Sequence, residues 1–186
     1  MKRWLILFVV GCLAVAGAAN AAVQQGDTEL DALGAWMTQN GEDDYPDTDV
    51  LFLSVGVGYF VTDNVQVQGA ALGAWTEVED VDVDIWAIGG RAKYHFMPTN
   101  QWVPYVGGQV LWANAETDGL DDLAGEPGWD ADSDGVLWGP VAGLRYELNA
   151  YNDFFVEYQY HIWSGDIGDA IEDGHALFVG LIHQFK

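Results

Sequence analysis

The chain has 186 residues, and its 29 Asp and Glu outnumber its 6 Lys and Arg, giving a formal net charge of −23. Such an acidic chain is a poor nucleic-acid binder, because phosphate backbones are recognised by clustered Lys and Arg. Its one cysteine, Cys12, lies near the N-terminus, so disulfides cannot stabilise the rest of the chain, yet 50% of the residues are hydrophobic.

Residues 1–21 are predicted to be a cleaved signal peptide. Two basic residues precede an apolar run over 4–18, which is short for a membrane-spanning helix, and small residues end the segment at Ala21. We expect cleavage after Ala21 and one domain over 22–186. The sequence around Cys12 also resembles a lipoprotein cleavage box, but cleavage there would leave an unusually short apolar region.

From Thr28 onward the chain consists of segments in which apolar and polar residues alternate. Side chains on a strand point alternately to the two faces of a sheet, so this period of two predicts strands. Eight strands are predicted, over 28–39, 49–60, 65–77, 83–96, 102–115, 136–148, 153–164 and 175–185.

The connections between these strands also alternate in kind. Short turns rich in Asp, Asn and Pro follow the second, fourth and sixth strands, and longer acidic connections follow the others. Barrels of the bacterial outer membrane have short periplasmic turns and longer outer loops. We therefore predict an all-β, eight-stranded antiparallel up-and-down transmembrane barrel in the outer membrane of a Gram-negative bacterium. The longer connections are 40–48, 78–82, 116–135 and 165–174.

Three strands separate an apolar face from a charged face, and we expect the apolar face to contact lipid. Removing Lys2 and Arg3 with the leader leaves four positive residues, of which three fall on the charged faces. An unmatched buried charge costs several kcal/mol, so we expect a structural plug of salt bridges, with Glu29 and Asp31 as further candidate partners. A proton- or anion-conducting path is the alternative. The predicted interior network is Arg91, Lys93, Arg145, Glu147, Glu157 and His161.

Most acidic residues fall in the longer connections. In the third of these, Asp130, Asp132, Asp134 and Gly135 match the start of a calcium-binding loop. The glutamate that should close such a loop is missing, since Val141 stands in its place. We therefore expect no resident cofactor and only weak Ca²⁺ or Mg²⁺ binding at the loops. A solvated surface that resists aggregation is the other interpretation.

One segment is superficially similar to the part of lipid A deacylases that bears a His-x-Ser pair. Here His161 and Ser164 are three residues apart, so they point to opposite faces of a strand. The histidine cannot then act as general base for the serine hydroxyl. We expect no enzymatic activity.

Seven tryptophans lie near predicted strand ends. Aromatic side chains gather at the two interfaces of a membrane, so we interpret these residues as girdles rather than as a stacking surface for a ligand. They are Trp36, Trp75, Trp86, Trp102, Trp112, Trp138 and Trp163.

The last strand resembles the C-terminal signal by which the barrel-assembly machinery recognises its substrates. The resemblance rests on alternating apolar residues that end in an aromatic one position before the C-terminus, whereas His183 and Lys186 depart from the usual form. The residues that match are Leu177, Val179, Leu181 and Phe185.

Four further segments, 57–64, 104–108, 139–146 and 155–160, resemble the superfamily of outer-membrane β-barrels that includes OmpA-like and OmpW-like domains. This resemblance implies a monomeric, non-enzymatic integral protein, surrounded by outer-membrane lipid and lipopolysaccharide, that contributes to envelope integrity or surface interaction. The alternative that it implies is a conduit for small hydrophobic solutes, as in OmpW-like members.

Overall fold

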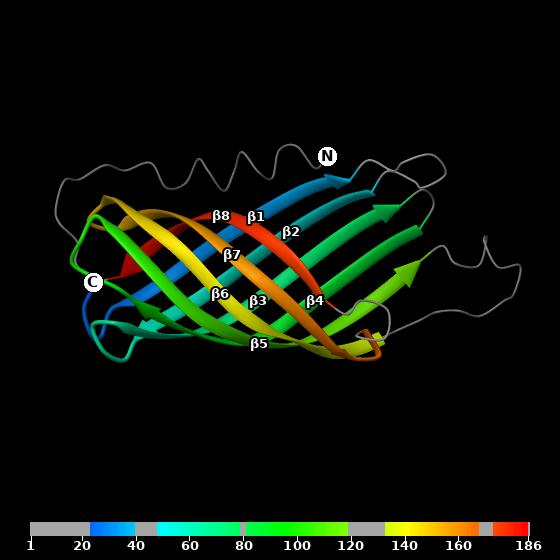
Figure 1. The fold of residues 1–186 in the computed structure, drawn as a ribbon, viewed down its shortest axis with the longest axis horizontal. Helices are drawn as coiled ribbons and strands as arrows, with labels where there is room; N and C mark the ends of the chain where they lie inside the picture. The colour runs from blue at the N-terminus through cyan, green and yellow to red at the C-terminus, as the bar shows by residue number, and fades with distance from the viewer. Residues whose placement is uncertain (1–22, 40–47, 79–80, 119–132, 168–172, 186) are drawn as a thin grey trace, which may run out of the picture.

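The computed structural model describes residues 23–39, 48–78, 81–118, 133–167 and 173–185. Each strand pairs antiparallel with the next, and β8 returns to pair with β1, so the sheet closes into a barrel (Figure 1). The predicted all-β, eight-stranded fold is confirmed. The strands are β1 (Thr28–Gln39), β2 (Thr48–Phe60), β3 (Val65–Val78), β4 (Val81–His95), β5 (Trp102–Asp118), β6 (Ser133–Asn149), β7 (Asn152–Gly165) and β8 (Asp173–Phe185).

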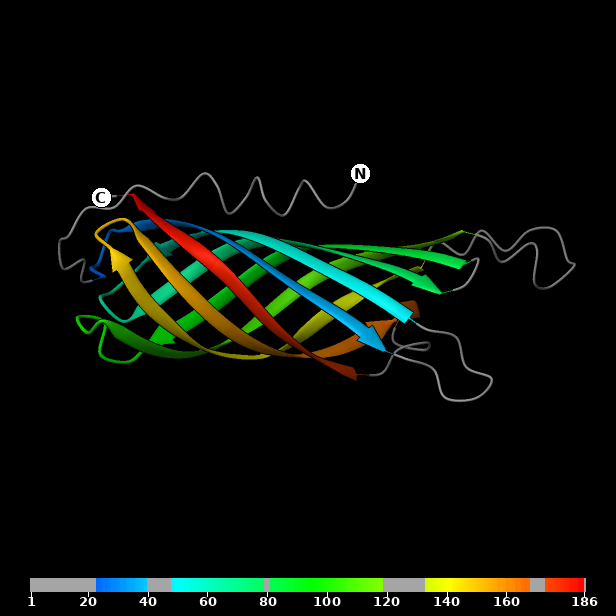
Figure 2. The same ribbon diagram turned by 90° about the horizontal axis from the view of Figure 1, so that it is seen from above.

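The barrel has two unlike ends. The turn end carries the short connections 61–64, 96–101 and 150–151, and the loop end carries the other four. The segment before β1 packs on the turn end, where the amide of Gly26 donates to the carbonyl of Phe60. The C-terminus lies at this end too, and the strands cross the long axis obliquely (Figures 1 and 2). Within the described part of the chain, no helix is long and apolar enough to cross a membrane.

One connection at the loop end is shorter than predicted. β3 continues to Val78 and β4 begins at Val81, so only 79–80 join them, rather than a loop over 78–82. The acidic residues in this stretch suggested a loop, but the valines between them favour strand and continue the ladder. The other predicted strand bounds agree with the structure to within three residues.

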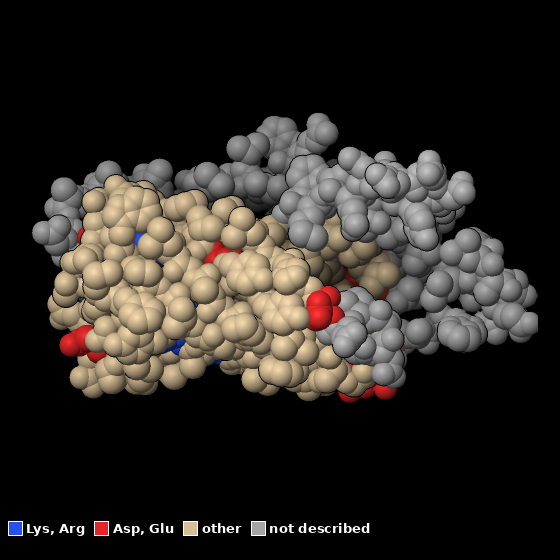
Figure 3. All heavy atoms as spheres, in the orientation of Figure 1, with Lys and Arg blue, Asp and Glu red and all other residues tan. Residues whose placement is uncertain are grey.

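The period of two in the sequence is also the period of burial. On β7, Phe155, Glu157 and Gln159 are buried in the barrel, while Phe154 and Tyr158, which alternate with them, are exposed on its outer wall. Because uncharged residues occupy most outward positions, they cover most of the wall between the two ends on the face seen in Figure 3. This is the surface that a hydrocarbon environment requires.

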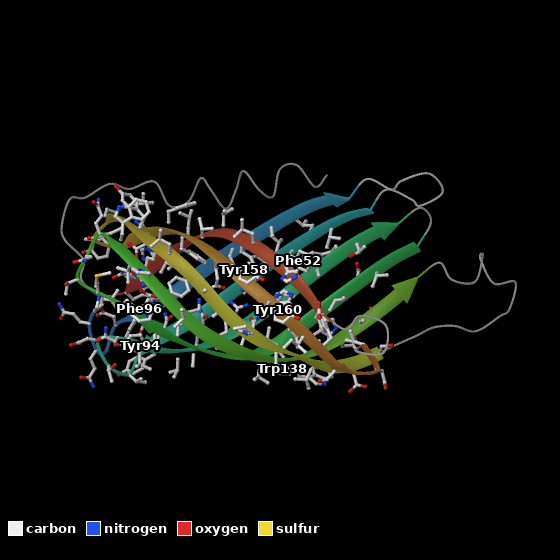
Figure 4. The ribbon with its side chains drawn as sticks, in the orientation of Figure 1. Phe52, Tyr94, Phe96, Trp138, Tyr158 and Tyr160 are labelled. Carbon is white, nitrogen blue, oxygen red and sulfur yellow. The ribbon has the colours of Figure 1, made fainter. Side chains whose placement is uncertain are left out.

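Exposed aromatic side chains gather toward each end of the wall. Figure 4 places Tyr94 and Phe96 near the turn end and Trp138 farther toward the loop end. Trp86 and Trp112 contact each other on the outer wall, with ring centroids 4.9 Å apart. Four of the predicted girdle tryptophans besides Trp138 are exposed, namely Trp75, Trp86, Trp102 and Trp112.

One of the predicted girdle tryptophans, Trp163, does not follow the prediction, and for Trp36 it stays a prediction. Trp163 packs against the buried core because it occupies an inward position on β7, and its ring contacts that of His161. The strand position, rather than closeness to a strand end, decides its environment. The side chain of Trp36 lies outside the described part of the structure.

The ladder between β6 and β7 is interrupted on the outer wall. β6 pairs with β7 up to Trp138 and again from Val141, which leaves Gly139 and Pro140 outside this ladder. Proline has no N–H to donate, and a Cβ atom at position 139 would collide with the backbone oxygen of Tyr160. The φ of 154° at Gly139 is one that residues with side chains rarely adopt.

Candidate functional site

The polar interior nearest the turn end is organised around Arg145 of β6. Its Nη2 pairs with Glu29 of β1, and its Nε pairs with Asp153 of β7. Gln66 of β3 donates to Glu29 at 2.8 Å, and Gln184 of β8 donates to Asp153 at 2.9 Å. One guanidinium, 1% exposed, therefore links side chains from five strands.

A second cluster lies next to the first and is organised around Lys93 of β4. The Lys93 Nζ is 2.7 Å from Glu157 Oε2 and 4.0 Å from Asp31 Oδ2. Tyr105 donates its hydroxyl to Glu157 at 2.8 Å, and Gln159 donates its amide to the other Glu157 oxygen at 2.6 Å. Glu157 is completely buried, and these three donors satisfy it.

Arg91 extends the second cluster through neutral groups. Its Nε donates to Gln109 and its Nη2 donates to Ser54, both at 3.0 Å. Gln109 in turn donates to Gln159 at 3.2 Å, and the Nε2 of His161 lies 2.9 Å from the same Gln159 oxygen. The result is a continuous hydrogen-bonded layer across the interior.

Two glutamines of β3 cross over glycines of β2 to reach carboxylates of β1. Each amide nitrogen donates to its carboxylate, and a Cβ atom on either glycine would lie too close to the crossing amide. Glycine is required here by the close approach of the side chain above it. The two units are Glu29–Gly58–Gln66 and Asp31–Gly56–Gln68.

The structure brings most of the predicted network together. Arg91, Lys93, Glu157 and His161 lie in one hydrogen-bonded layer, and Arg145 lies in the neighbouring cluster. Glu147 differs, since it is only partly buried near the turn end. The candidate partners Glu29 and Asp31 are both buried beside these cations.

Several network residues were missed from the sequence. Asp153 follows a turn, so it resembles a turn residue rather than the partner of an arginine. Gln66 and Gln68 alternate with valines in β3, and that alternation identifies the inward face of the strand. The sequence does not indicate that Tyr105 faces inward, because a tyrosine is also common among the outward residues of an aromatic girdle.

The interior nearer the loop end is apolar instead. Inward residues there come after the buried polar positions on β1 and β3 and before them on β4 and β8. The predicted plug of salt bridges therefore occupies only the part of the interior nearer the turn end. We call the buried apolar set the apolar layer; it comprises Leu33, Leu72, Ala87, Leu111, Ala113, Leu137 and Phe178, with Phe52 packed against it.

The geometry does not assemble a histidine–serine pair. His161 is buried and contacts Gln159, whereas the hydroxyl of Ser164 is exposed and donates to the carbonyl of Val136 at 3.2 Å. The two side chains therefore have different partners on different faces of β7, as their spacing indicates.

Two further predicted sets of residues do not belong to the interior network that the structure describes. Asp130 and Asp132 are outside the described residues, and Asp134 is exposed in β6, so the cation site stays a prediction. No cluster of metal-binding side chains occurs among the residues that the structure describes. The residues of the assembly signal, Leu177, Val179, Leu181 and Phe185, share the outer face of β8.

Solved structures with this architecture are distant in sequence. Neisserial surface protein A superposes with a TM-score of 0.61 at 17% identity, covering 91% of this chain and 100% of that chain. The N-terminal barrel of OprF from Pseudomonas aeruginosa gives 0.53 at 19% identity, covering 87% and 99%. Ail, the attachment invasion locus protein of Yersinia pestis, gives 0.51 at 13% identity, also covering 87% and 99%. At these identities the likeness concerns the fold.

Sequence comparison supplies the family. No curated protein sequence matches the chain. The outer membrane protein beta-barrel domain, by contrast, matches residues 8–185, which is nearly the whole chain. The chain therefore belongs to the outer membrane protein beta-barrel family, and it is an integral protein of the Gram-negative outer membrane.

Proposed function

We propose that this protein is a closed, non-enzymatic barrel that anchors acidic loops at the outer surface of the membrane. In this proposal the turn end faces the periplasm and the loop end faces outward, among lipopolysaccharide. The protein then contributes to envelope integrity or surface interaction through its loops, and the barrel itself transports nothing.

The observation that carries the proposal is the continuous packing of the interior. Eight strands enclose a space just wide enough for side chains to fill. Here Arg145, Lys93 and Glu157 span that space with charged hydrogen bonds, and Leu111 and Leu137 fill it nearer the loop end without exposure. A surface anchor needs such a rigid barrel and no passage through it.

An epitope inserted between Asp118 and Ser133 tests the proposed orientation and role. We expect intact cells that produce this variant to bind the antibody, because the insertion lies at the loop end. A second insertion in the turn 61–64 is the matched control and should become reactive only after the cells are permeabilised. The reverse pattern would contradict the proposal.

A conduit for small hydrophobic solutes is the second candidate. It is favoured by a hollow of about 960 Å³ on the outer wall, whose lining includes Gly69, Gly90 and Gly108 and reaches Gly139 and Pro140, where the ladder between β6 and β7 is interrupted. The interior side of this wall is filled by buried Gln109, which argues against passage. Uptake of an apolar dye into vesicles that contain the protein, above the rate of protein-free vesicles, would favour the conduit.

A further inference from the structure

The seam between β1 and β8 is paired over only part of its length. The register between the two strands ends at the pair Gly34 and Val179. β1 nevertheless stays in its ladder with β2 to its last residue, and β8 is in its ladder with β7 from its first. Within the described part of the chain, residues 35–39 and 173–178 therefore have a paired strand on one side only. The two strands diverge toward the loop end (Figures 1 and 2).

The backbone groups that point into the open part of the seam follow from the alternation of an antiparallel ladder. The amide of Gln184 donates to the carbonyl of Tyr151, on the β7 side of β8. Every second residue of β8 has its N–H and C=O on that side, since the register with β7 is continuous. The residues between them point the other way. Among the described residues, no strand therefore pairs with the N–H and C=O groups of Leu177, His175 and Asp173, which face the open seam.

The outer face of this edge is polar toward the loop end. Asp173 and His175 are exposed. The hydroxyl of Tyr160 donates to Asp173 at 2.9 Å, and the hydroxyl of Tyr158 lies 2.6 Å from the Nδ1 of His175 (Figure 4). Leu177, the next outward residue, is 62% exposed. Tyrosines with polar partners beside an apolar residue are typical of the boundary between lipid and water. The open edge therefore lies at the loop-end boundary of the membrane, where a polypeptide can reach it.

The interior behind the open part of the seam is filled. Phe178 of β8 is completely buried, and its ring centroid lies 6.0 Å from that of Phe52 on β2. The ring of His161 lies beside both, at centroid distances of 6.3 Å from Phe178 and 6.4 Å from Phe52. These side chains remain in contact where the backbones of β1 and β8 separate. The seam therefore lacks a partner for its backbone, and it gives no passage into the barrel.

A strand edge matches an extended polypeptide better than it matches other molecules. Alternate residues of an added strand supply N–H and C=O groups at the spacing of the edge, and these main-chain hydrogen bonds give affinity. An acyl chain or a small apolar solute supplies neither donor nor acceptor at that spacing. A second copy of the barrel would have to bring its own edge past β1, whereas a single added strand can pair with β8 while β1 stays in place.

Charge and packing select the composition of the added strand. The segments 40–48 and 165–174, which join β1 to β2 and β7 to β8, each contain four acidic residues and no basic residue. Complementary charge steers association, so these surroundings favour a basic segment. The inward side chains of the added strand must be small, because Phe178 and its neighbours already fill the interior.

We infer that the open edge of β8, residues 173–177, binds an extended, basic polypeptide segment of a partner protein by strand addition. The inference deepens the proposed role in surface interaction by naming the kind of partner. It rests on that proposed function, since the loop end must face outward for a partner outside the cell to reach the edge.

Hydrogen exchange of single backbone amides, followed by nuclear magnetic resonance on the labelled protein in detergent micelles, tests the edge. The amides of His175 and Leu177 should exchange at least about tenfold faster than those of Val179 and Leu181, which face β1 in the paired part of the seam. A synthetic peptide in which alanine alternates with lysine and valine should then slow exchange at His175 and Leu177. Equal exchange at all four amides without peptide would overturn the inference, because the edge would already be paired by β1 or a second copy. Unchanged exchange after peptide addition would overturn it too.

Two controls separate strand addition from simple charge attraction. The same peptide N-methylated at every residue keeps its charge but cannot donate to the edge, so it should give no protection. His175→Pro removes one N–H from the edge and should abolish protection at Leu177, whereas His175→Ala keeps that N–H and should retain protection. Proline is tolerated on an edge strand, and migration on detergent gels before boiling confirms that both variants fold. Protection by the methylated peptide, or equal protection in the two variants, would contradict strand addition.

These measurements use purified protein in micelles, so their outcome does not depend on which way the barrel is inserted in a membrane. A negative result rejects strand addition alone. The epitope insertions described above test the orientation and the proposed function separately.

Discussion

At the scale of single residues, Arg145 shows how one side chain can hold distant parts of the chain together. It lies 116 residues from Glu29 in the sequence and pairs with it across the interior. The same guanidinium pairs with Asp153, the second residue of β7. A buried pair adds little stability relative to a well-packed apolar core, but breaking it leaves an uncompensated charge.

Replacing Arg145 by methionine should therefore destabilise the barrel strongly. Glu29 and Asp153 would both lose their cation in a buried site, at a cost of about 3–5 kcal/mol. Arg91→Met is the matched control, because the hydrogen bonds of Arg91 go to the neutral Gln109 and Ser54. This variant should lower the free energy of unfolding by less than Arg145→Met does. Urea unfolding in lipid vesicles, followed by tryptophan fluorescence, measures both. Equal losses of unfolding free energy in the two variants would show that pairing with carboxylates is not what stabilises the network.

Gly56→Ala tests the glycine beneath a crossing glutamine. The new Cβ would lie 2.7 Å from Asp31 Oδ1 and would displace the amide of Gln68 from its carboxylate. Breaking one buried hydrogen bond to a charged group should cost about 1–3 kcal/mol in the free energy of unfolding. Gly69→Ala on the outer wall is the control, since nothing lies within 4 Å of its added Cβ. An unchanged free energy of unfolding in Gly56→Ala would refute the steric argument.

At the scale of elements, the interior separates into a polar network and the apolar layer. On β3, Gln66 and Gln68 lie inward nearer the turn end, and Leu72 follows them nearer the loop end. The same change from polar to apolar occurs between Asp31 and Leu33 on β1. The chain thus places its buried charges at one level along the barrel, where they can reach one another.

The apolar layer should be the main barrier to ions, because a packed apolar region offers no partners to water or to an ion. Leu111 and Leu137 pair across β5 and β6 and are both fully buried. The double variant Leu111→Ala/Leu137→Ala should show brief openings in planar bilayers, whereas Glu157→Gln should stay silent. Migration on detergent gels before boiling confirms that each variant has folded. Openings in Glu157→Gln but not in the double variant would assign the barrier to the ion pairs.

Sequence alternation predicts the inward and outward faces of some strands but not of others. The alternation on β4, β6 and β7 identified the lipid-facing wall and the inward cations, because apolar and charged residues there occupy opposite faces. On β1, β3 and β5 small residues occupy both faces, so the inward Tyr105 could not be assigned, and only the short alternation with valines marks Gln66 as inward. Which carboxylate meets which cation depends on strand stagger around the closed barrel, and Asp153 with Arg145 is a pair that the sequence pattern alone does not specify.

At the scale of the whole molecule, the outer wall and the interior have opposite requirements. The wall presents mostly uncharged side chains on the face seen in Figure 3, and Arg91, Lys93 and Arg145 are buried inside with carboxylates. Most of the excess negative charge lies in the connections at the loop end. A closed barrel therefore keeps its acidic segments on one side of the membrane and separates them from the lipid.

Single-channel recording in a planar lipid bilayer tests the central claim, that the folded barrel is closed, most directly. Purified full-length protein, shown to be folded by its migration on detergent gels, is inserted at neutral pH and a range of voltages is applied. We predict no steady conductance above that of the protein-free bilayer, because side chains fill the interior from the Arg145 cluster to the apolar layer. A large, steady open-channel current from the unmodified protein would contradict the account.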